Sequence, residues 1–442
     1  MEVETVLVTG AAGFIGPQVV RLLLQETKLR VIVVDKLTYA ARVDETTGKP
    51  TSLEMVLSSF AKDIDLQSRY CFVKYDICET KPSIKDLLDK YAVDYVIHMA
   101  AESHVDRSTE GKPDFIRTEI FGTYNLLEAI RAQNTGRARK VKRAVFVSTD
   151  EVYGSIERIA GFDAQAWYGL SDTKAGRLIE KYQFTEATSL AGGSPYASCK
   201  GGADLLVCAY FNTFRWNPDN GKIDLDRMPV IITRGVNNFG YFQHPEKLIP
   251  MAICTLLHPQ DSKEKARRIP IYDKGLAVRE WLRTEDYASA IVHVMKYGTI
   301  GEVYNVGSGN RCRNRDLLLA IFRACREEHA AFNSLAEASF DATTVGGVAR
   351  PGHDLCYSVN CDKIHRLGWE PQHGANFEQK LRDVVDWYVK NQDWWKPLWL
   401  SEDFTAFWNK KYRKIMELSD RSFDFYQKHH AARKLQEALL DF

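Results

Sequence analysis

Two adjacent carboxylates follow a short apolar run in the middle of the chain. Asp150 and Glu151 belong to the stretch STDEVYG, which comes directly after the residues AVFV. Neighbouring acids repel each other and lose solvation near a core, so ionising one raises the pKa of the other. The pair is therefore expected to supply two proton carriers.

A tyrosine and a lysine four residues apart form a second reactive group. Tyr196 and Lys200 of SPYASCK lie on one face of the helix expected to begin there. An ammonium beside a phenol lowers the phenol pKa, so that the phenolate can act as a base near neutral pH. Surface helices also produce this spacing by chance. Its place after a nucleotide-binding half, with Thr149 on the preceding strand end, favours the catalytic interpretation.

A glycine-rich turn near the N-terminus indicates a dinucleotide site. GAAGFIG places Gly10, Gly13 and Gly16 between an apolar strand and a helix, where backbone amides can approach a pyrophosphate. Taken alone, the pattern also fits a simple tight turn. Asp35 ends the next strand about 20 residues later, where a carboxylate accepts ribose hydroxyls and repels a 2′-phosphate. NAD is therefore favoured over NADP.

The third strand end also has a polar residue at the position where an adenine would lie. Asp76 and Ile77 stand in YDIC, directly after that strand. A strand-end aspartate often only caps a turn. The match of three successive strand ends favours the cofactor interpretation.

These groups need a scaffold of parallel strands. Apolar runs at 5–10, 30–35, 69–76, 94–101, 144–149 and 229–234 alternate with longer segments of helical period. Strands that are apolar on both faces and separated by helices predict an α/β fold with a Rossmann-type, doubly wound parallel sheet. The rhythm then becomes irregular, with a helix at 246–258 and short strands at 268–273 and 302–307. We expect an NAD-binding domain at 1–235, a smaller C-terminal α/β substrate domain at 236–396 and a helical extension at 397–442.

Composition narrows the class of protein further. Of 442 residues, 45% are hydrophobic, as in an ordinary globular protein, and 59 basic residues nearly balance 58 acidic ones. No basic block indicates a nucleic-acid partner, and no run of about 18 uncharged apolar residues indicates a membrane span. The nine cysteines form no CxxC pair, so no metal site is expected. With no signal-like start, a cytoplasmic enzyme with reduced thiols is expected.

Several longer motifs together resemble a known family. They are VTGAAGFIG, DKLTYA, HMAAESHVDRS, STDEVYG, SPYASCKGGADLL, NNFGYFQHPEKLIP, VREWLRTEDYASAI, GEVYNVGSGN and ARPGHD. In this order they resemble the extended short-chain dehydrogenase/reductases acting on nucleotide sugars, and among them the dTDP-glucose 4,6-dehydratases. The resemblance extends from about residue 5 to about residue 390.

The resemblance implies a three-step reaction on the glucose moiety. Tyr196 would take the proton of the 4-hydroxyl while NAD accepts the C4 hydride, with Thr149 near that oxygen and Lys200 tuning the phenol. The new ketone acidifies the C5 proton. Glu151 would remove that proton, and Asp150 would protonate the departing C6 hydroxyl. Hydride return to C6 then gives a 4-keto-6-deoxy sugar.

Binding residues follow from the matching motifs. The implied cofactor contacts are Gly10, Gly13, Phe14, Ile15, Gly16, Asp35, Lys36, Leu37, Thr38, Asp76, Ile77, Met99, Ala100, Ala101, Ser103, Thr118, Tyr196, Lys200 and Asn238. The implied substrate contacts are Ser103, Thr149, Asn237, Lys247, Leu248, Pro270, Tyr272, Arg279, Asn314, Arg350 and His353. The two arginines would offer forked donors to the diphosphate.

Three positions depart from the family pattern. Tyr241 stands where proline is usual, Asp273 where glycine is usual, and Glu119 where asparagine is common. These departures affect loop shape and nucleotide contacts, whereas the proton carriers are all present.

Other functions remain possible at this point. A UDP-glucose 4,6-dehydratase would differ in accepting a base without one methyl group, which is worth only about 1 kcal/mol in an apolar pocket. A nucleotide-sugar 4-epimerase or decarboxylase would not need the acid pair. A non-catalytic NAD-binding regulatory protein would be expected to lack one of the five reactive residues. The resemblance also implies a homodimer that pairs through the segments 113–133 and 196–214.

Overall fold

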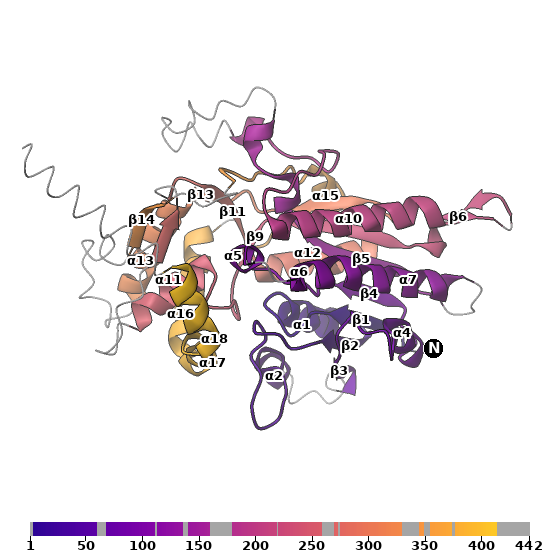
Figure 1. Ribbon diagram of the computed structural model, residues 1–442, viewed down its shortest axis with the longest axis horizontal. Helices are drawn as coiled ribbons and strands as arrows, with labels where there is room; N and C mark the ends of the chain where they lie inside the picture. Colours follow the sequence, from indigo (N-terminus) through magenta and orange to yellow (C-terminus); the bar gives the residue numbers. More distant parts are fainter. Residues whose placement is uncertain are drawn as a thin grey trace, which may run out of the picture. The chain divides into compact units, whose positions relative to one another are not determined.

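The structure is a computed structural model, and it forms two compact units that the chain enters more than once (Figure 1). It describes residues 3–59, 68–110, 113–135, 140–159, 179–218, 220–258, 269–272, 275–328, 344–348, 354–373 and 376–412. Unit 1 comprises 1–244, 278–312 and 352–380. Unit 2 comprises 245–277, 313–351 and 381–442.

Unit 1 is built on a seven-stranded, all-parallel sheet in the order β12-β8-β5-β4-β1-β2-β3. Its strands are β1 (Thr5–Thr9), β2 (Arg30–Asp35), β3 (Tyr70–Lys74), β4 (Tyr95–His98), β5 (Arg143–Thr149), β8 (Val230–Gly235) and β12 (Val303–Val306). Val6 pairs with Val31 on one side and with Tyr95 on the other, so the strand order reverses at β1. Ligands bind at such switch points, outside the carboxyl ends of the strands.

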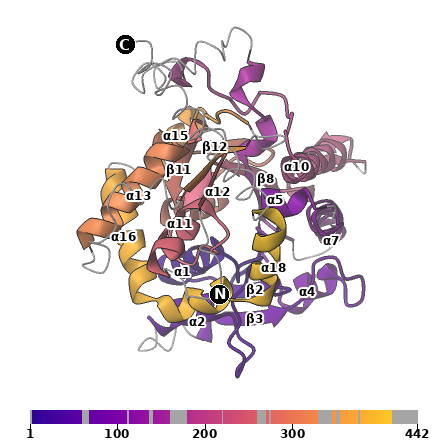
Figure 2. The ribbon, with the colours of Figure 1, turned by 60° about the vertical axis from the view of Figure 1, so that its left-hand side comes forward.

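Helices cover both faces of this sheet (Figures 1 and 2). One layer contains α1 (Gly16–Glu26), α2 (Thr51–Ser58) and α12 (Thr284–Tyr297), and the other contains α4 (Ile84–Lys90), α7 (Thr123–Asn134) and α10 (Pro195–Phe214). Val6, Leu7 and Val8 are fully buried because both faces of β1 are covered. The second layer encloses a core cluster that includes Leu126 and Ile130.

Shorter elements complete unit 1. They are α5 (Val105–Ser108), α6 (Asp114–Ile116), the π-helical η1 (Arg117–Gly122), the 3₁₀ turns η2 (Asp150–Tyr153), η3 (Ile156–Arg158) and η4 (Leu225–Arg227), the hairpin β6 (Trp216–Asn217) and β7 (Lys222–Ile223), and α15 (Asp362–Arg366). A three-stranded sheet has the order β13-β11-β9, from β9 (Asn237–Phe239), β11 (Val278–Arg283) and β13 (Arg311–Arg313).

Unit 2 combines helices with a two-stranded parallel sheet. Its elements are α11 (Leu248–Leu257), β10 (Ile269–Tyr272), α13 (Asn314–Glu328), β14 (Thr344–Val348), α17 (Gln392–Trp399) and α18 (Glu402–Lys411), and α16 (Phe377–Lys390) passes from unit 1 into it. Trp394, Trp395 and Trp399 are buried. The Trp-rich stretch therefore serves packing in this unit.

The fold class read from the sequence is confirmed, and all six expected strands of the large sheet are present. One difference concerns β12. The sequence placed this strand in the second domain, because the alternation of strands and helices becomes irregular there. Val303 of β12 pairs with Ile232 of β8, which makes β12 an edge strand of the main sheet. The compact units thus alternate along the chain, whereas the expected boundaries at 235 and 396 divide it linearly.

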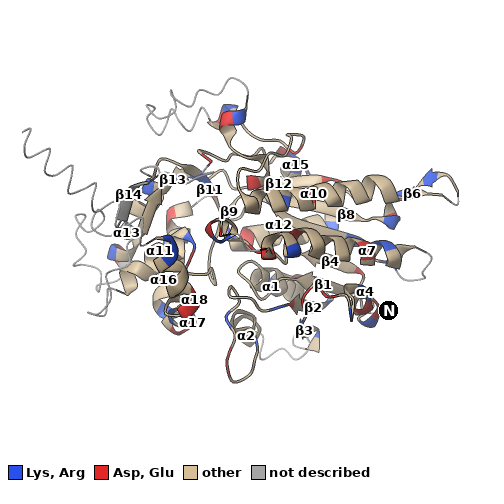
Figure 3. Ribbon diagram, in the orientation of Figure 1, with Lys and Arg blue, Asp and Glu red and all other residues tan. Residues whose placement is uncertain are grey.

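Charges of both signs are interspersed along the elements of each unit (Figure 3). Within the described residues, no helix is long and apolar enough to cross a membrane. The same residues contain no group of three or more His, Cys, Asp or Glu placed to hold a metal ion.

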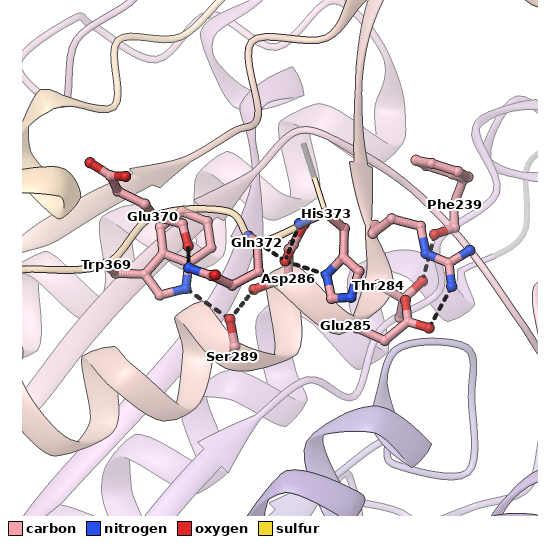
Figure 4. Close-up of polar contacts among 10 residues, drawn as sticks. Phe239, Thr284, Glu285, Asp286, Ser289, Trp369, Glu370, Gln372 and His373 are labelled. Atoms are coloured by element: carbon pink, nitrogen blue, oxygen red, sulfur yellow. Dashed lines mark hydrogen bonds and ion pairs between the residues drawn. The ribbon is translucent and has the colours of Figure 1, made fainter. Parts of the chain in front are cut away.

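A buried aspartate at the start of α12 fixes the segment that returns to unit 1 late in the chain (Figure 4). Asp286 accepts hydrogen bonds from the backbone amide of Gln372 at 2.9 Å and from that of His373 at 3.0 Å. The His373 ring nitrogen Nδ1 lies 2.7 Å from the same carboxylate. One turn further along, Ser289 accepts a bond from the Trp369 indole at 2.8 Å. These contacts hold the segment 354–373 to helix α12 at its C-terminal end.

Candidate active site

The glycine-rich turn lies at the carboxyl end of β1, as the sequence predicts. Gly10 has φ +73°, and a Cβ there would come within 2.5 Å of the Ala100 backbone. A Cβ at Gly16 would come within 2.3 Å of Ala11, so both glycines are required by packing. A Cβ at Gly13 would meet nothing closer than 3.5 Å. The protein itself does not need glycine there, so Gly13 leaves a cradle where a pyrophosphate can approach the backbone.

Asp35 links this turn to the end of β2. Its carboxylate accepts the Ala12 amide at 3.0 Å and the Leu37 amide at 2.8 Å. Burial raises the pKa of Asp35, and the two amide donors oppose that effect. An acidic group at this strand end, beside an open glycine turn, fits the adenosine ribose of NAD.

The other residues expected at the cofactor lie in loops after neighbouring strands. Asp76 accepts the Cys78 amide at 2.9 Å after β3, and the amides of Met99 and Ala100 donate to Thr9 after β4. The loops after β1, β2 and β4 contain Phe14, Ile15, Lys36, Leu37, Thr38, Ala101 and Ser103, and Ile77 follows β3. The structure thus brings these residues to one edge of the sheet.

The acid pair follows β5 and begins η2. Thr149 caps this turn by accepting the Glu151 amide at 3.3 Å, and its hydroxyl donates to Asp150 Oδ1 at 3.2 Å. The Oδ2 atom of Asp150 is buried and has no hydrogen-bond partner among the described residues. Burial, followed by the charges of Glu151 and Glu280, raises the pKa of Asp150 well above its usual value. The raised pKa favours the protonated form of Asp150, the form needed for the proton donor that the resemblance implies.

A buried network fixes the backbone just after the pair. Arg234 of β8 forms an ion pair with Asp204 of α10 at 2.8 Å and donates to the Tyr153 hydroxyl at 2.8 Å. Tyr153 in turn donates to Asn305 of β12 at 2.7 Å. Gly154 then turns the chain at φ +77°, and a Cβ there would lie 2.5 Å from the Ala191 carbonyl oxygen. The two carboxylates are therefore attached to a rigid strand end.

Tyr196 and Lys200 lie in the first turns of α10. Ser194 caps this helix by accepting the Ala197 amide at 3.1 Å, and Pro195 occupies its first position. Both reactive side chains are buried. Lys200 Nζ donates to the Val147 carbonyl of β5 at 3.2 Å.

The electrostatics at Tyr196 differ from the expectation that Lys200 lowers the phenol pKa. Burial, followed by the charges of Glu151, Glu119 and Asp150, raises the pKa of Tyr196 well above its usual value. The Lys200 ammonium forms an ion pair with Glu119 at 2.9 Å. Burial is the largest cause of the difference, and the Glu119 carboxylate adds to it by offsetting the positive potential of the ammonium.

Arg279 of β11 lies close enough to the acid pair for its positive charge to oppose part of the rise in the Asp150 pKa. Its guanidinium donates to the carbonyls of Val278 at 2.8 Å and Asp354 at 2.9 Å, and it stacks over the Tyr357 ring at 4.4 Å. The Tyr357 hydroxyl donates to the Asp354 carboxylate. Burial and then Glu151 raise the Tyr357 pKa.

The remaining residues expected at the cofactor or the substrate are distributed over both units. Asn237 and Asn238 are in β9 of unit 1, and their side-chain oxygens are buried without a hydrogen-bond partner among the described residues. Thr118 is in η1, where its hydroxyl accepts Lys36 at 3.1 Å. Unit 2 contains Lys247, Leu248, Pro270, Tyr272 and Asn314. Arg350 and His353 lie outside the described residues.

Sequence reasoning missed four residues that shape this site. Tyr287 of α12 donates to the Ser148 carbonyl at 3.2 Å, so it supports β5 from the sheet face opposite to α10. Glu280 accepts the Ser308 amide at 2.8 Å and raises the pKa of Asp150. Tyr357 and Asp354 come from a segment with no helical or strand period. Glu280 and Tyr287 had a signal because both stand in the motif VREWLRTEDYASAI, and Asp354 had one because it ends the motif ARPGHD.

Comparison with known sequences gives a consistent result. Residues 6–307 match the model of the NAD dependent epimerase/dehydratase family. The chain is 36% identical over 395 residues to a dTDP-glucose 4,6-dehydratase of Neisseria meningitidis serogroup B, a match that spans 88% of this chain and 95% of the relative. It is 37% identical over 393 residues to dTDP-glucose 4,6-dehydratase 1 of Escherichia coli K12, with 88% and 94% covered.

Solved structures agree with these relatives. A dTDP-glucose 4,6-dehydratase from Streptomyces venezuelae, with NAD and TYD bound, matches at TM-score 0.67 and 35% identity over 89% of this chain and 99% of that one. A dTDP-glucose 4,6-dehydratase from Bacillus anthracis in complex with NAD matches at TM-score 0.65 and 31% identity, with 89% and 99% covered.

Proposed function

The chain belongs to the NAD dependent epimerase/dehydratase family, and from that premise we infer that it is an NAD-dependent dTDP-glucose 4,6-dehydratase, a hydro-lyase. It converts dTDP-glucose into dTDP-4-keto-6-deoxyglucose. The relatives that support this activity match along nearly nine tenths of the chain. A cytoplasmic location remains a prediction, in line with a biosynthetic activity on nucleotide sugars.

Each proton in the reaction has a residue to move it. Bound NAD supplies the redox chemistry, in which hydride leaves C4 of the sugar and returns at C6. Tyr196 accepts the proton of the 4-hydroxyl, and Thr149 hydrogen-bonds that oxygen. Glu151 removes the C5 proton and later returns a proton to C5. Asp150 donates its proton to the C6 hydroxyl, so that water leaves.

The observation on which this assignment rests is the acid pair after β5. Epimerisation at C4 needs only oxidation and reduction at one carbon, for which Tyr196 suffices. Elimination of water needs both an acid and a base on the C5–C6 side. Asp150, with its raised pKa, and Glu151 beside it supply that combination on adjacent residues.

A direct assay tests the function. We expect purified enzyme with NAD to convert dTDP-glucose into a product with the alkaline absorbance of a 4-keto-6-deoxy sugar. UDP-glucose is the comparison, because its base lacks one methyl group, worth about 1 kcal/mol, and its ribose has a 2′-hydroxyl, so its turnover should be lower. Conversion of neither nucleotide sugar would overturn the proposed function, and faster turnover of UDP-glucose would reassign the base.

We further propose a homodimer formed by η1, α7 and α10. Together with the adjoining α6, these neighbouring elements expose large apolar side chains, namely Ile116, Phe121, Tyr124 and Leu205. Phe121 and Tyr124 stack with ring centroids 6.2 Å apart. Apolar side chains gathered on one face are typical of a protein interface.

Light scattering tests the dimer. We expect a mass close to twice the 50.4 kDa of one chain. Leu205→Arg should reduce the mass to that of one chain, because it buries a charge in the apolar contact. Ile223→Arg is the control, since this exposed residue lies in the hairpin β6–β7 instead. A wild-type mass of one chain would contradict the proposal.

A further inference from the structure

A buried glutamate contacts the lysine of the catalytic pair. Glu119 lies in the π-helical segment η1, and its Oε2 is 2.9 Å from Lys200 Nζ. The side chains are 2% and 9% exposed, so this ion pair is shielded from water. Glu119 Oε1 accepts the Glu102 backbone amide at 3.0 Å. The carboxylate is thus fixed on one side by the backbone and on the other by the ammonium.

The Lys200 ammonium has a second hydrogen-bond partner besides Glu119. Lys200 Nζ also donates to the Val147 carbonyl at 3.2 Å, so it is bound between β5 and η1. Val147 is in β5, a few residues before the acid pair that follows this strand. The position of Lys200 relative to the strand end therefore depends on Glu119.

A second ion pair continues from Glu119 towards the surface. Lys36 lies 3.2 Å from Glu102 and donates to Thr118, the neighbour of Glu119, at 3.1 Å. The Lys36 side chain is 28% exposed. Glu119 is thus faced by Lys36 and Glu102 from the loops after β2 and β4, and by Lys200, Tyr196 and Cys199 from α10.

The negative charge of Glu119 opposes the effect of the Lys200 ammonium on the ionisation of Tyr196. An ammonium alone would favour the ionised phenol of Tyr196, whereas a neutralised pair exerts a much weaker potential. Glu119 is one of the charges that raise the Tyr196 pKa. The other groups facing Tyr196 are Asp150 and Glu151 from η2 and Tyr287 from α12.

We propose that Glu119 is a positioning residue for the reaction, which fixes the Lys200 ammonium at the strand end and limits the positive field that reaches Tyr196. The proposal rests on the proposed function of the same site. It assigns Glu119 a role through Lys200, with no contact to substrate.

Glu119→Gln separates charge from shape. Glutamine retains an oxygen that can accept from Lys200 but has no charge, so the phenol of Tyr196 should ionise at lower pH. We expect the acid limb of the kcat/KM profile to move down by about one pH unit, a tenfold change in the ionisation constant. Glu119→Asp keeps the charge with a shorter reach, so the limb should stay in place while kcat falls.

A second measurement does not depend on turnover. Ultraviolet difference titration of each protein against its own Tyr196→Phe version reports ionisation of that phenol alone. We expect Glu119→Gln to shift this titration to lower pH as well. Glu128→Gln is the matched control, because Glu128 also forms an ion pair, with Arg131 on α7, and should shift neither profile.

The possible results separate the role of Glu119 from the proposed dehydratase function. An unshifted titration and an unshifted acid limb in Glu119→Gln would overturn the role of Glu119. A folded wild type without dehydratase activity would overturn the proposed function, while the titration would still decide the effect of Glu119 on Tyr196. A merely structural role predicts loss of folded protein with no shift.

Discussion

Glu151→Gln is expected to retain NAD and to lose about 10²- to 10⁴-fold in kcat, because glutamine cannot remove the C5 proton. The amide is close in shape to the carboxylate and leaves the η2 turn in place. Oxidation at C4 does not use Glu151, so the loss should fall on elimination. In D₂O the wild type should place deuterium at C5 of the product, and mass spectrometry of sugar recovered from the variant should show no exchange at C5.

The control for this experiment is another acid-to-amide change nearby. Glu157→Gln alters an exposed side chain in η3, so kcat should stay near the wild-type value. Retention of NAD by Glu151→Gln, measured after denaturation, shows that the site is intact. Full activity in this variant would remove Glu151 from the mechanism.

Tyr196→Phe is expected to lower kcat by a similar factor of about 10²- to 10⁴-fold, through a different step. Phenylalanine keeps the buried ring but has no hydroxyl to accept the proton of the 4-hydroxyl. The block therefore precedes ketone formation, and the C5 proton keeps its ordinary low acidity. Product formation and C5 exchange should therefore both fall by this factor.

Tyr210→Phe is the matched control on the same helix. The Tyr210 hydroxyl donates to Glu128 at 2.7 Å, in the layer between α10 and α7. Its loss should cost about 1 kcal/mol of stability and leave kcat unchanged. C5 exchange at the wild-type rate in Tyr196→Phe would show that another group performs the first proton transfer.

The strands of the large sheet were predictable because each is a short, continuous apolar run. Strand β12 is different, since VYNV contains a buried Asn305 whose polarity is satisfied only by partners far along the chain, such as Tyr153. No local period reveals such a partner. Its place at the edge of the sheet follows from pairing with β8, which is a tertiary property.

The candidate reactive residues could be proposed from the sequence because they too form local patterns. Thr149, Asp150 and Glu151 are consecutive, and Tyr196 and Lys200 share one helix face. The effect of Glu119 on Lys200 was not predictable, although the sequence marked Glu119 as unusual, because the two residues meet only in the folded protein.

The alternation of the two units has a consequence for synthesis. The chain passes between them after residues 244, 277, 312, 351 and 380. When the first 244 residues have left the ribosome, β8 is still a sheet edge with unpaired backbone groups, because β12 has not been made. The partners of Asp286 at residues 372 and 373 emerge later still. The β8 edge can therefore be paired only after residues 303–306 have been made, and unit 1 can be completed only after residue 373.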